Sequence, residues 1–197
     1  MLGLLAARTG MLLDYANVAR DSGIKSVTVK EWVGLLQRTD LVYCLKPYAS
    51  NLNKRLTKAP KLYFMDTGLA TRLQGWQDQT PLMMSPQVGA LFETLVFDEI
   101  YKFIQNYAKD WQLYLWRTKE GEEIDFVIMT ESGKVLALDA KIGMHNVQPV
   151  ELPASFKKHF PEVSTLLLVT FGGQKLQLSK GCLALPISAL HDFLKQI

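Results

Sequence analysis

The sequence predicts an α/β (α+β) protein with a small helical module over residues 1–75 and a larger module, built on a mixed sheet, over residues 85–197. The first supporting observation is charge: residues 1–75 hold 11 Lys and Arg against 5 Asp and Glu, whereas residues 76–197 hold 11 against 14. The second is the order of patterns, because a helix-turn-helix pattern comes first and helices then combine with strand-like segments. A basic module joined to an acidic one suggests that the basic module faces a polyanion.

Composition excludes several classes of protein. Apolar residues make up 48% of the chain and charged residues 21%, which is typical of a globular domain and not of a disordered segment. No apolar run approaches the roughly 20 residues that a membrane-spanning helix needs. Residues 1–7 lack the basic leader of a signal peptide, so we interpret them as a first helix. Cys44 and Cys182 lie far apart without a CxxC motif, which fits a reducing cytoplasm.

Residues 14–36 predict a helix-turn-helix. Asp14 is an N-cap residue type before a short helix over residues 15–20, and Asp21-Ser22-Gly23 breaks the chain. Ser26 is the expected cap of the second helix. The spacing of its apolar residues predicts one buried stripe made of Val29, Trp32, Val33 and Leu36.

Two strand-like segments, residues 41–45 and 61–65, follow the second helix. The loop between them is rich in Pro and Asn, and residues 46–61 contain five Lys or Arg and no acid. Helix, turn, helix and a basic hairpin together predict a winged helix, with the basic loop as its wing.

We expect this winged helix to bind DNA through basic side chains, because lysine and arginine contact phosphates. The expected nucleic-acid-binding residues are Lys30 on the second helix and Lys54, Arg55, Lys58 and Lys61 in and beside the wing. Two alternatives stay open. The basic segment suits a solubilising loop, and the module suits protein binding, since the exposed Thr28, Lys30 and Glu31 offer one Lys and one Glu.

Residues 76–84 are the expected linker, because Gly75 and Pro81 interrupt the apolar periodicity there. Ser85-Pro86 is a strong helix start, and a broad apolar stripe follows it. Glu93 falls at the edge of that stripe and Glu99 falls inside it. A carboxylate that faces a core needs a metal ion, a basic side chain or a helix cap as its partner.

Three strands are expected over residues 112–117, 123–129 and 134–142, the last two joined by a tight turn. Alternation places Asp125 on one face of its strand, and Asp139 and Lys141 on one face of the partner strand. If the turn has an odd number of residues or a bulge, Asp125 lies opposite Asp139. The intervening positions on both strands are apolar throughout.

Phosphodiester hydrolysis is the chemistry that needs this set of side chains. Asp125 and Asp139 would hold Mg²⁺, with Mn²⁺ as a substitute, and Glu93 would add a further or water-mediated ligand. Lys141 would orient the attacking water and offset developing charge. The alternative is an exposed hairpin with an Asp–Lys surface pair, which stabilises a protein by only about 0–1 kcal/mol.

The remaining elements complete the larger module. We expect a helix over residues 152–160, a buried strand over 164–171, a last strand over 183–187 and a terminal helix over 188–195. The order α-β-β-β-α-β with one late strand is typical of an α/β sandwich around a mixed sheet.

Four blocks of the sequence resemble a known family. They are Lys61-Leu62-Tyr63-Phe64-Met65-Asp66-Thr67-Gly68-Leu69-Ala70; Gly89-Ala90-Leu91-Phe92-Glu93 with Val96 and Glu99; Trp116-Arg117-Thr118 with Glu123-Ile124-Asp125-Phe126-Val127; and Asp139-Ala140-Lys141. Together they resemble the C-terminal half of a large prokaryotic family of AAA-type ATPases. In that family an ATPase module precedes a winged helix and a domain of unknown function with the restriction-endonuclease-like, PD-(D/E)xK fold.

The resemblance implies an ATPase module that is missing from this chain. No G-x-x-x-x-G-K-[ST] phosphate loop occurs, and Gly23-Ile24-Lys25-Ser26 lacks its spacing. We therefore expect a fragment, a single-domain product or a truncated gene product, without ATPase activity of its own. Asp139 stands where the family more often has Glu, which shortens the reach to a metal by one methylene.

Two functions follow as hypotheses. The first is a Mg²⁺-dependent deoxyribonuclease that uses Glu93, Asp125, Asp139 and Lys141 as its catalytic residues. The second is a catalytically inactive, nuclease-like module that binds DNA or protein and targets or regulates an ATPase. The acidic balance of residues 76–197 favours the second, because nucleases usually surround their site with Lys and Arg.

Overall fold

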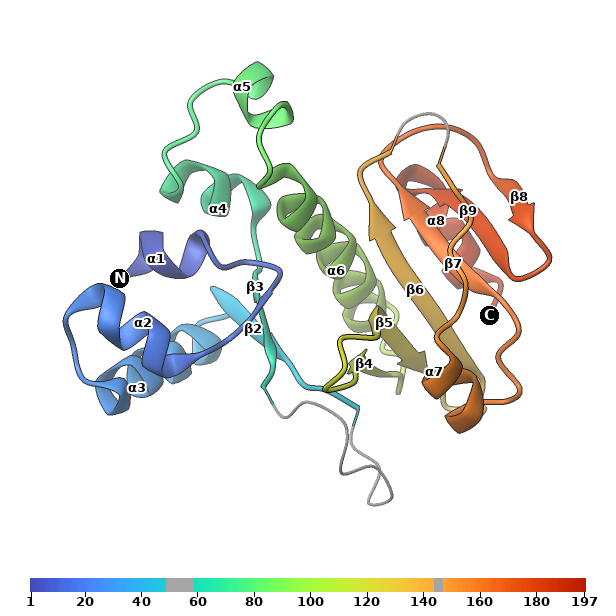
Figure 1. Cartoon of the computed structure of the whole chain (residues 1–197), viewed down its shortest axis with the longest axis horizontal. Helices are drawn as coiled ribbons and strands as arrows, with labels where there is room; N and C mark the ends of the chain where they lie inside the picture. The colour runs from blue at the N-terminus through green and yellow to red at the C-terminus, as the bar shows by residue number, and fades with distance from the viewer. Residues whose placement is uncertain (49–58, 144–146) are drawn as a thin grey trace. The chain divides into compact units, whose positions relative to one another are not determined.

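The computed structural model describes residues 1–48, 59–143 and 147–197. Lys54, Arg55 and Lys58 of the expected DNA-binding set therefore lie outside the described residues. The chain divides into two compact units, and the boundary falls inside one long helix (Figure 1). Unit 1 comprises Met1–Leu45 and Ala59–Leu95, and unit 2 comprises Val96–Ile197 together with the segment that begins at Lys46.

Unit 1 opens with three helices. These are α1 (Leu2–Ala6), α2 (Tyr15–Ser22) and α3 (Ser26–Arg38). The Asp14 carboxylate caps α2 as predicted, because its Oδ1 accepts from the backbone N–H groups of Ala16 and Asn17 at 2.9 and 3.2 Å. Gly23 ends α2 in the left-handed conformation, with φ of 71°, which favours glycine. Lys25, and not the predicted Ser26, occupies the N-cap position of α3, without a side-chain bond.

A small antiparallel sheet completes the core of unit 1. Its strands are β1 (Met11–Leu12), β2 (Val42–Leu45) and β3 (Lys61–Phe64), in the order β1-β3-β2. All four residues of β3 are buried, since β3 is the central strand. Val18, Val29 and Val33 from the helices pack with Leu62 and Phe64 of β3. Trp32 is 45% exposed, so its predicted place in the buried stripe of α3 is wrong.

The segment expected as a linker contains a helix. After α4 (Thr67–Leu73), which Asp66 caps through its bond from the Leu69 N–H, α5 (Gln79–Met83) lies within residues 76–84. The long helix α6 (Val88–Asn106) starts three residues after Ser85, where the sequence predicted its beginning. Its first half belongs to unit 1 and its second half to unit 2.

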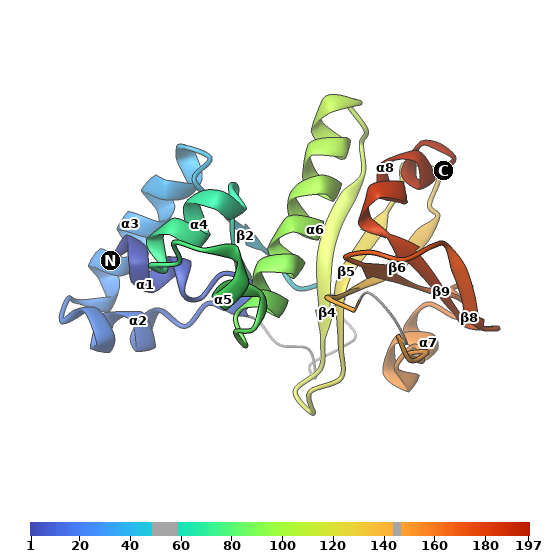
Figure 2. The ribbon, with the colours of Figure 1, turned by 90° about the horizontal axis from the view of Figure 1, so that it is seen from above.

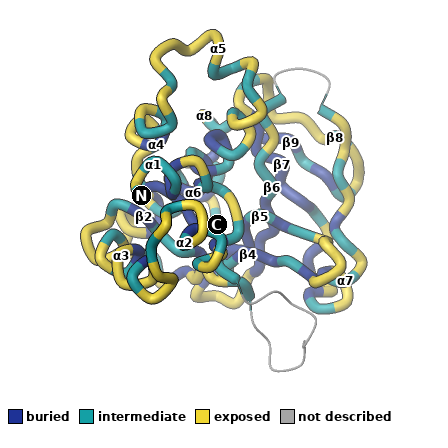
Figure 3. The backbone as a smooth tube through the Cα atoms, turned by 60° about the vertical axis from the view of Figure 1, so that its left-hand side comes forward, coloured by how far each residue is buried: buried dark blue, intermediate teal, exposed yellow. Residues whose placement is uncertain are grey.

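Unit 2 is built on a mixed sheet of six strands in the order β4-β5-β6-β7-β9-β8. The strands are β4 (Gln112–Arg117), β5 (Glu123–Met129), β6 (Val135–Lys141), β7 (Leu166–Thr170), β8 (Leu176–Ser179) and β9 (Cys182–Pro186). Neighbours from β4 to β6 are antiparallel, β6, β7 and β9 are mutually parallel, and β8 returns antiparallel to β9. The sequence did not predict β8, whose residues are mostly exposed (Figure 3).

Helices cover both faces of this sheet. α7 (Ala154–His159) and α8 (Ile187–Lys195) lie on opposite sides of it (Figure 2). On the α7 side, Phe156 packs with Trp116, Val127 and Ala137 in one buried cluster. On the other side, Phe97 of α6 contacts Phe126, with 6.3 Å between the ring centroids. The α7 side of the sheet is therefore also apolar over most of its length, since Val127, Val135 and Ala137 are buried there.

Residues 46–48 add a short extended segment to the outer edge of β4. Leu115 N donates to Lys46 O at 3.1 Å, and Tyr48 N donates to Leu115 O at 2.7 Å. The Tyr48 ring stacks on the buried Trp116 at 6.0 Å between centroids, and its hydroxyl lies 3.3 Å from His159 Nε2. This aromatic packing and the two backbone hydrogen bonds hold Tyr48 against β4.

In the part of the chain that the structure describes, every helix is too short or too polar to cross a membrane.

Candidate active site

Asp125 and Asp139 occupy facing positions on β5 and β6. The register pairs Phe126 with Leu138 and Val127 with Ala137, so the next step along both strands brings Asp125 opposite Asp139. Five residues, 130–134, join the two strands. This odd number meets the condition under which the sequence predicted that the two aspartates face each other.

Each of the two aspartates accepts a hydrogen bond from the backbone of the opposite strand. Asp139 Oδ1 accepts from Asp125 N at 3.0 Å, and Asp125 Oδ2 accepts from Ala140 N, also at 3.0 Å. These reciprocal bonds take over where the backbone ladder between β5 and β6 stops at Phe126 and Leu138. Both carboxylates are half-buried and are held in fixed orientations, because each is tied to a rigid strand.

A β-bulge adjoins Asp125. Tyr114 pairs with Val127 and Trp116 pairs with Ile124, so two steps along β4 correspond to three steps along β5. The extra residue therefore lies at Asp125 or Phe126. Bulges bend a strand and re-aim its side chains, and they are frequent beside active sites. Here the bulge lies at the end of the hairpin that carries Asp125 and Asp139.

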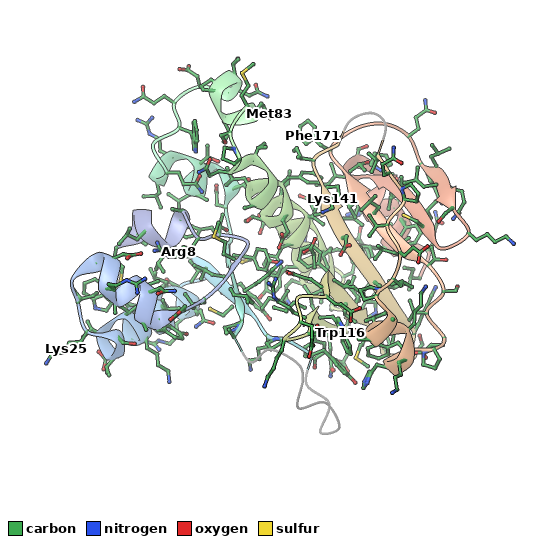
Figure 4. The ribbon with its side chains drawn as sticks, in the orientation of Figure 1. Arg8, Lys25, Met83, Trp116, Lys141 and Phe171 are labelled. Atoms are coloured by element: carbon green, nitrogen blue, oxygen red, sulfur yellow. The ribbon has the colours of Figure 1, made fainter. Side chains whose placement is uncertain are left out.

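Lys141 ends β6 and shares a face with Asp139, two residues earlier. It is exposed and lies beside Thr170 in the parallel ladder between β6 and β7. Figure 4 shows it near the end of β6 that is opposite the turn from β5. Among the described residues, no ion pair within 4 Å involves Lys141. Its ammonium is therefore accessible to an anionic ligand.

Glu93 belongs to unit 1, where two side chains of β3 bind it. Lys61 Nζ and Tyr63 Oη both donate to Glu93 Oε1, at 2.8 and 2.6 Å. Lys61 is 4% exposed and Tyr63 is fully buried. Of the partners that the sequence allowed for a carboxylate near the core, the structure places a basic side chain there. The same contact corrects the assignment of Lys61 to the phosphate-binding set, because its ammonium points inward.

Besides Lys61, Lys30 is the expected DNA-binding residue that lies in the described part of the chain. It is exposed on α3. Glu99, the second carboxylate that the sequence placed near the core of α6, is half-buried.

Two polar side chains that hold charges near the cores, Asp98 and Tyr63, were not predicted from the sequence. Asp98, which is 2% exposed, is the deeply buried acid of α6, and its Oδ2 accepts from Lys102 Nζ at 2.7 Å. Their spacing of four residues was the available signal. Tyr63 was assigned only to a strand, although alternation places Lys61 and Tyr63 on one face of β3.

A divalent cation would find two protein carboxylates at the Asp125–Asp139 position. Within the described residues, no three side chains of His, Cys, Asp or Glu converge into a metal-binding group. Mg²⁺ is usually held by one or two carboxylates and completes its octahedron with water and substrate phosphates. The oxygen-only donor pair therefore fits Mg²⁺, and it does not fit a closed structural zinc site.

Two different families match two successive parts of the chain. A family described as a domain of unknown function, DUF8612, matches residues 1–80. A second family described as a domain of unknown function, DUF4143, matches residues 88–190, which is more than half of the chain. The second match contains all four residues proposed above as catalytic.

Two curated relatives are uncharacterized proteins of Mycobacterium bovis and Mycobacterium tuberculosis. Each is 31% identical to this chain over 125 residues, which are 64% of the chain and 27% of the relative. The chain thus spans about a quarter of the length of the curated relatives that it matches. No solved structure matches the chain.

Proposed function

The chain belongs to the DUF4143 family of domains of unknown function, and from this premise we propose that it is a nucleic-acid-associated module with a Mg²⁺-dependent phosphodiester-hydrolysing site. The proposed site consists of Asp125, Asp139 and Lys141. The observation that carries the proposal is that two aspartates from neighbouring strands face each other beside a bulge, with an exposed lysine two residues further on the same face.

The topology of unit 2 supports a restriction-endonuclease-like fold. The elements α6, β4, β5, β6, α7 and β7 follow one another in the expected α-β-β-β-α-β order. The first three strands are antiparallel neighbours, and the fourth lies parallel to the third. In this arrangement the two acids and the lysine fall on the neighbouring strands β5 and β6, the positions that the resemblance assigns to the PD-(D/E)xK motif.

The topology of unit 1 supports a winged helix. Its order is helix, strand, two helices and two strands, and the strand from the first connection pairs with the last strand of the hairpin. The connection between β2 and β3 carries Lys54, Arg55 and Lys58 in the sequence. We propose that these residues and Lys30 contact the phosphates of DNA, because a basic wing and an exposed helix are the elements with which winged helices bind it.

When bound between Asp125 and Asp139, Mg²⁺ would supply a Lewis acid for the scissile phosphate and lower the pKa of a bound water. The contribution of the chain itself is positional. The backbone N–H groups of Asp125 and Ala140 fix one oxygen of each carboxylate. Lys141 would hold the attacking water in line with the departing oxygen and offset the negative charge on the phosphate.

We also propose that the chain acts together with an AAA-type ATPase module. The relatives are much longer than the matched region, which leaves room for such a module beside it. Glu93 is not part of the proposed hydrolytic site, because Lys61 and Tyr63 bind its carboxylate within unit 1.

A second function, a nuclease-like binding module without turnover, is favoured by one observation. Asp125 and Asp139 each hold the backbone of the opposite strand, which is a structural role that needs no metal. Such a module would bind DNA or a protein and target or regulate the ATPase.

Cleavage of labelled duplex, single-stranded and branched DNA separates the two functions. We expect cutting with Mg²⁺ or Mn²⁺, and its loss in Asp125→Asn and Lys141→Ala. Lys134→Ala is the matched control, because Lys134 is an exposed lysine at the other end of the same hairpin. Cutting that survives in both site variants would contradict the proposed site.

Binding to the same DNA tests the inactive alternative. Without cleavage, retained binding that weakens in Lys54→Ala/Arg55→Ala would favour the targeting module. Loss of two phosphate contacts should also lower the slope of log affinity against log salt by about 2. An unchanged affinity would remove the wing from the proposal.

A further inference from the structure

Helix α3 exposes three large apolar side chains. Val27 is 69% exposed, Leu35 is 52% exposed and Trp32 is 45% exposed. Val29 and Val33 are fully buried on the core side of the helix, and Trp32 lies at the edge of that side, because it follows Val29 by three residues. Val27 and Trp32 flank Leu35, at about 80° and about 60° from it around the helix, so Leu35 lies at the centre of an exposed apolar strip that favours contact with another molecule.

The exposed face of α3 carries one acid and one base in a self-complementary arrangement. Glu31 and Arg38 lie seven residues apart, which is two helical turns, and therefore on the same side of the helix. Leu35 lies between them. Glu31 and Arg38 are both exposed, and among the described residues neither takes part in an ion pair within 4 Å.

An antiparallel second copy of α3 would satisfy both charges at once. With a twofold axis near Gly34 and Leu35, Glu31 lies opposite Arg38 of the partner subunit, and the symmetric pair forms on the other side of the axis. Gly34 has no side chain to hold the helices apart. A Cβ placed there would meet only the Nη1 atom of Arg38, at 3.6 Å, so the space beside Gly34 is bordered by a flexible side chain.

We propose that the chain forms a homodimer through the exposed face of α3, with Leu35 at the twofold axis and two Glu31–Arg38 ion pairs across it. Val27 and Trp32 lie at the margins of this interface and lose solvent contact there. This dimer does not depend on the proposed hydrolytic function, because no residue of the Asp125–Asp139 site takes part in it.

DNA fits this face less well than a second copy does. A phosphate backbone laid along it would meet the carboxylate of Glu31 and the apolar side chains of Trp32 and Leu35, and such groups do not bind phosphates. Lys30 lies on a different side of α3 from Leu35, since five residues place two side chains about 140° apart. Lys30 would therefore stay accessible to DNA in the dimer.

Sedimentation equilibrium of the full chain at several concentrations tests the proposal by reversing charges. One helix pair is a small interface, so we expect a dissociation constant on the order of 10–100 µM. Glu31→Arg and Arg38→Glu should each weaken dimerisation by about 10-fold, because like charges then meet across the axis. The double variant Glu31→Arg/Arg38→Glu restores opposite charges and should return to within about 3-fold of the original.

Two further variants complete the design. Leu35→Asp should abolish the dimer, and circular dichroism should show an intact fold, because this side chain is half exposed. Lys25→Glu reverses a charge at the N-cap of α3, outside the pairing face, and should leave dimerisation unchanged (Figure 4). A chain that stays monomeric at concentrations of about 1 mM would overturn the proposal. A double variant that dimerises no more tightly than the two single variants would also overturn it.

Discussion

Both units hold carboxylates close to their cores, but the groups that bind these carboxylates differ. In unit 1, Glu93 receives hydrogen bonds from the buried Lys61 and Tyr63 side chains. In unit 2, Asp125 and Asp139 receive theirs from backbone N–H groups, and the neighbouring lysine stays exposed. In unit 1 the ammonium of Lys61 compensates the charge of the Glu93 carboxylate. In unit 2 the donors are neutral backbone N–H groups, so these bonds orient the two carboxylates without compensating their charge.

The difference has a physical consequence for function. A buried ion pair is costly to break, since the remaining charge has no water to solvate it. Two carboxylates that face each other repel one another, so a cation bound between them would be favourable. The unit 1 cluster is therefore suited to hold structure, and the unit 2 pair is suited to hold a ligand.

Replacing Glu93 with Ala should have the largest effect on stability. Lys61 and Glu93 side chains are 5% and 15% exposed, so the variant leaves a buried ammonium without its carboxylate. We expect a loss of about 3–5 kcal/mol in the free energy of unfolding, measured by urea denaturation. In the double variant Lys61→Met/Glu93→Leu, most of this loss should disappear. A loss below about 1 kcal/mol in Glu93→Ala would show that the pair contributes little.

Asp125→Asn should separate activity from stability. An amide oxygen still accepts from Ala140 N, so we expect the free energy of unfolding to fall by no more than about 1 kcal/mol. Metal-dependent cleavage should fall by about 100-fold or more, because the charge that attracts the cation is gone. If Asp125→Asn instead destabilised the chain as much as Glu93→Ala, the two regions would not differ in the way described above, and Asp125 would be structural.

The smallest effect concerns the interior of unit 1 at alkaline pH. Burial raises the pKa of the Cys44 thiol from 9.0 to about 11. Because the folded state prefers the neutral thiol, this contribution to stability is fully present below pH 9 and is lost as the pH rises through about 11. Unfolding curves between pH 8 and pH 11 should therefore show a shallower decline in Cys44→Ser. Parallel declines in the two proteins would contradict a partly buried thiol that stays neutral in the folded state.

Local patterns predicted the elements of unit 2 well, and long-range packing changed their surroundings. Alternation placed Asp125, Asp139 and Lys141 on one face, since this depends only on the extended backbone of each strand. The same alternation put Val127, Val135 and Ala137 on the face of the acids. The structure places Val127 and Ala137 of that face under α7, so only its end is polar. Which helix covers a strand depends on the topology of the sheet, and no local pattern contains that information.

In unit 1 the largest error concerned α3. The spacing of Val29, Trp32, Val33 and Leu36 predicted one buried stripe, but Trp32 lies at the stripe's edge and is 45% exposed. A helix buries only the side that its neighbours reach, and α3 packs on its Val29 and Val33 side. Periodicity identifies an apolar residue near the stripe, but it does not say how far the neighbouring elements extend.

The sequence by itself determined most helices and strands and the alternation that places Asp139 and Lys141 on one face of β6. These follow from periodicity, capping residues and glycine turns, which act over a few neighbouring residues. Tertiary structure alone decided that Lys61 pairs with Glu93 and not with a phosphate, that a bulge lies beside Asp125, and that Trp32 is exposed. Lys61 and Glu93 are 32 residues apart, and only the packing of β3 against α6 brings such distant charges together.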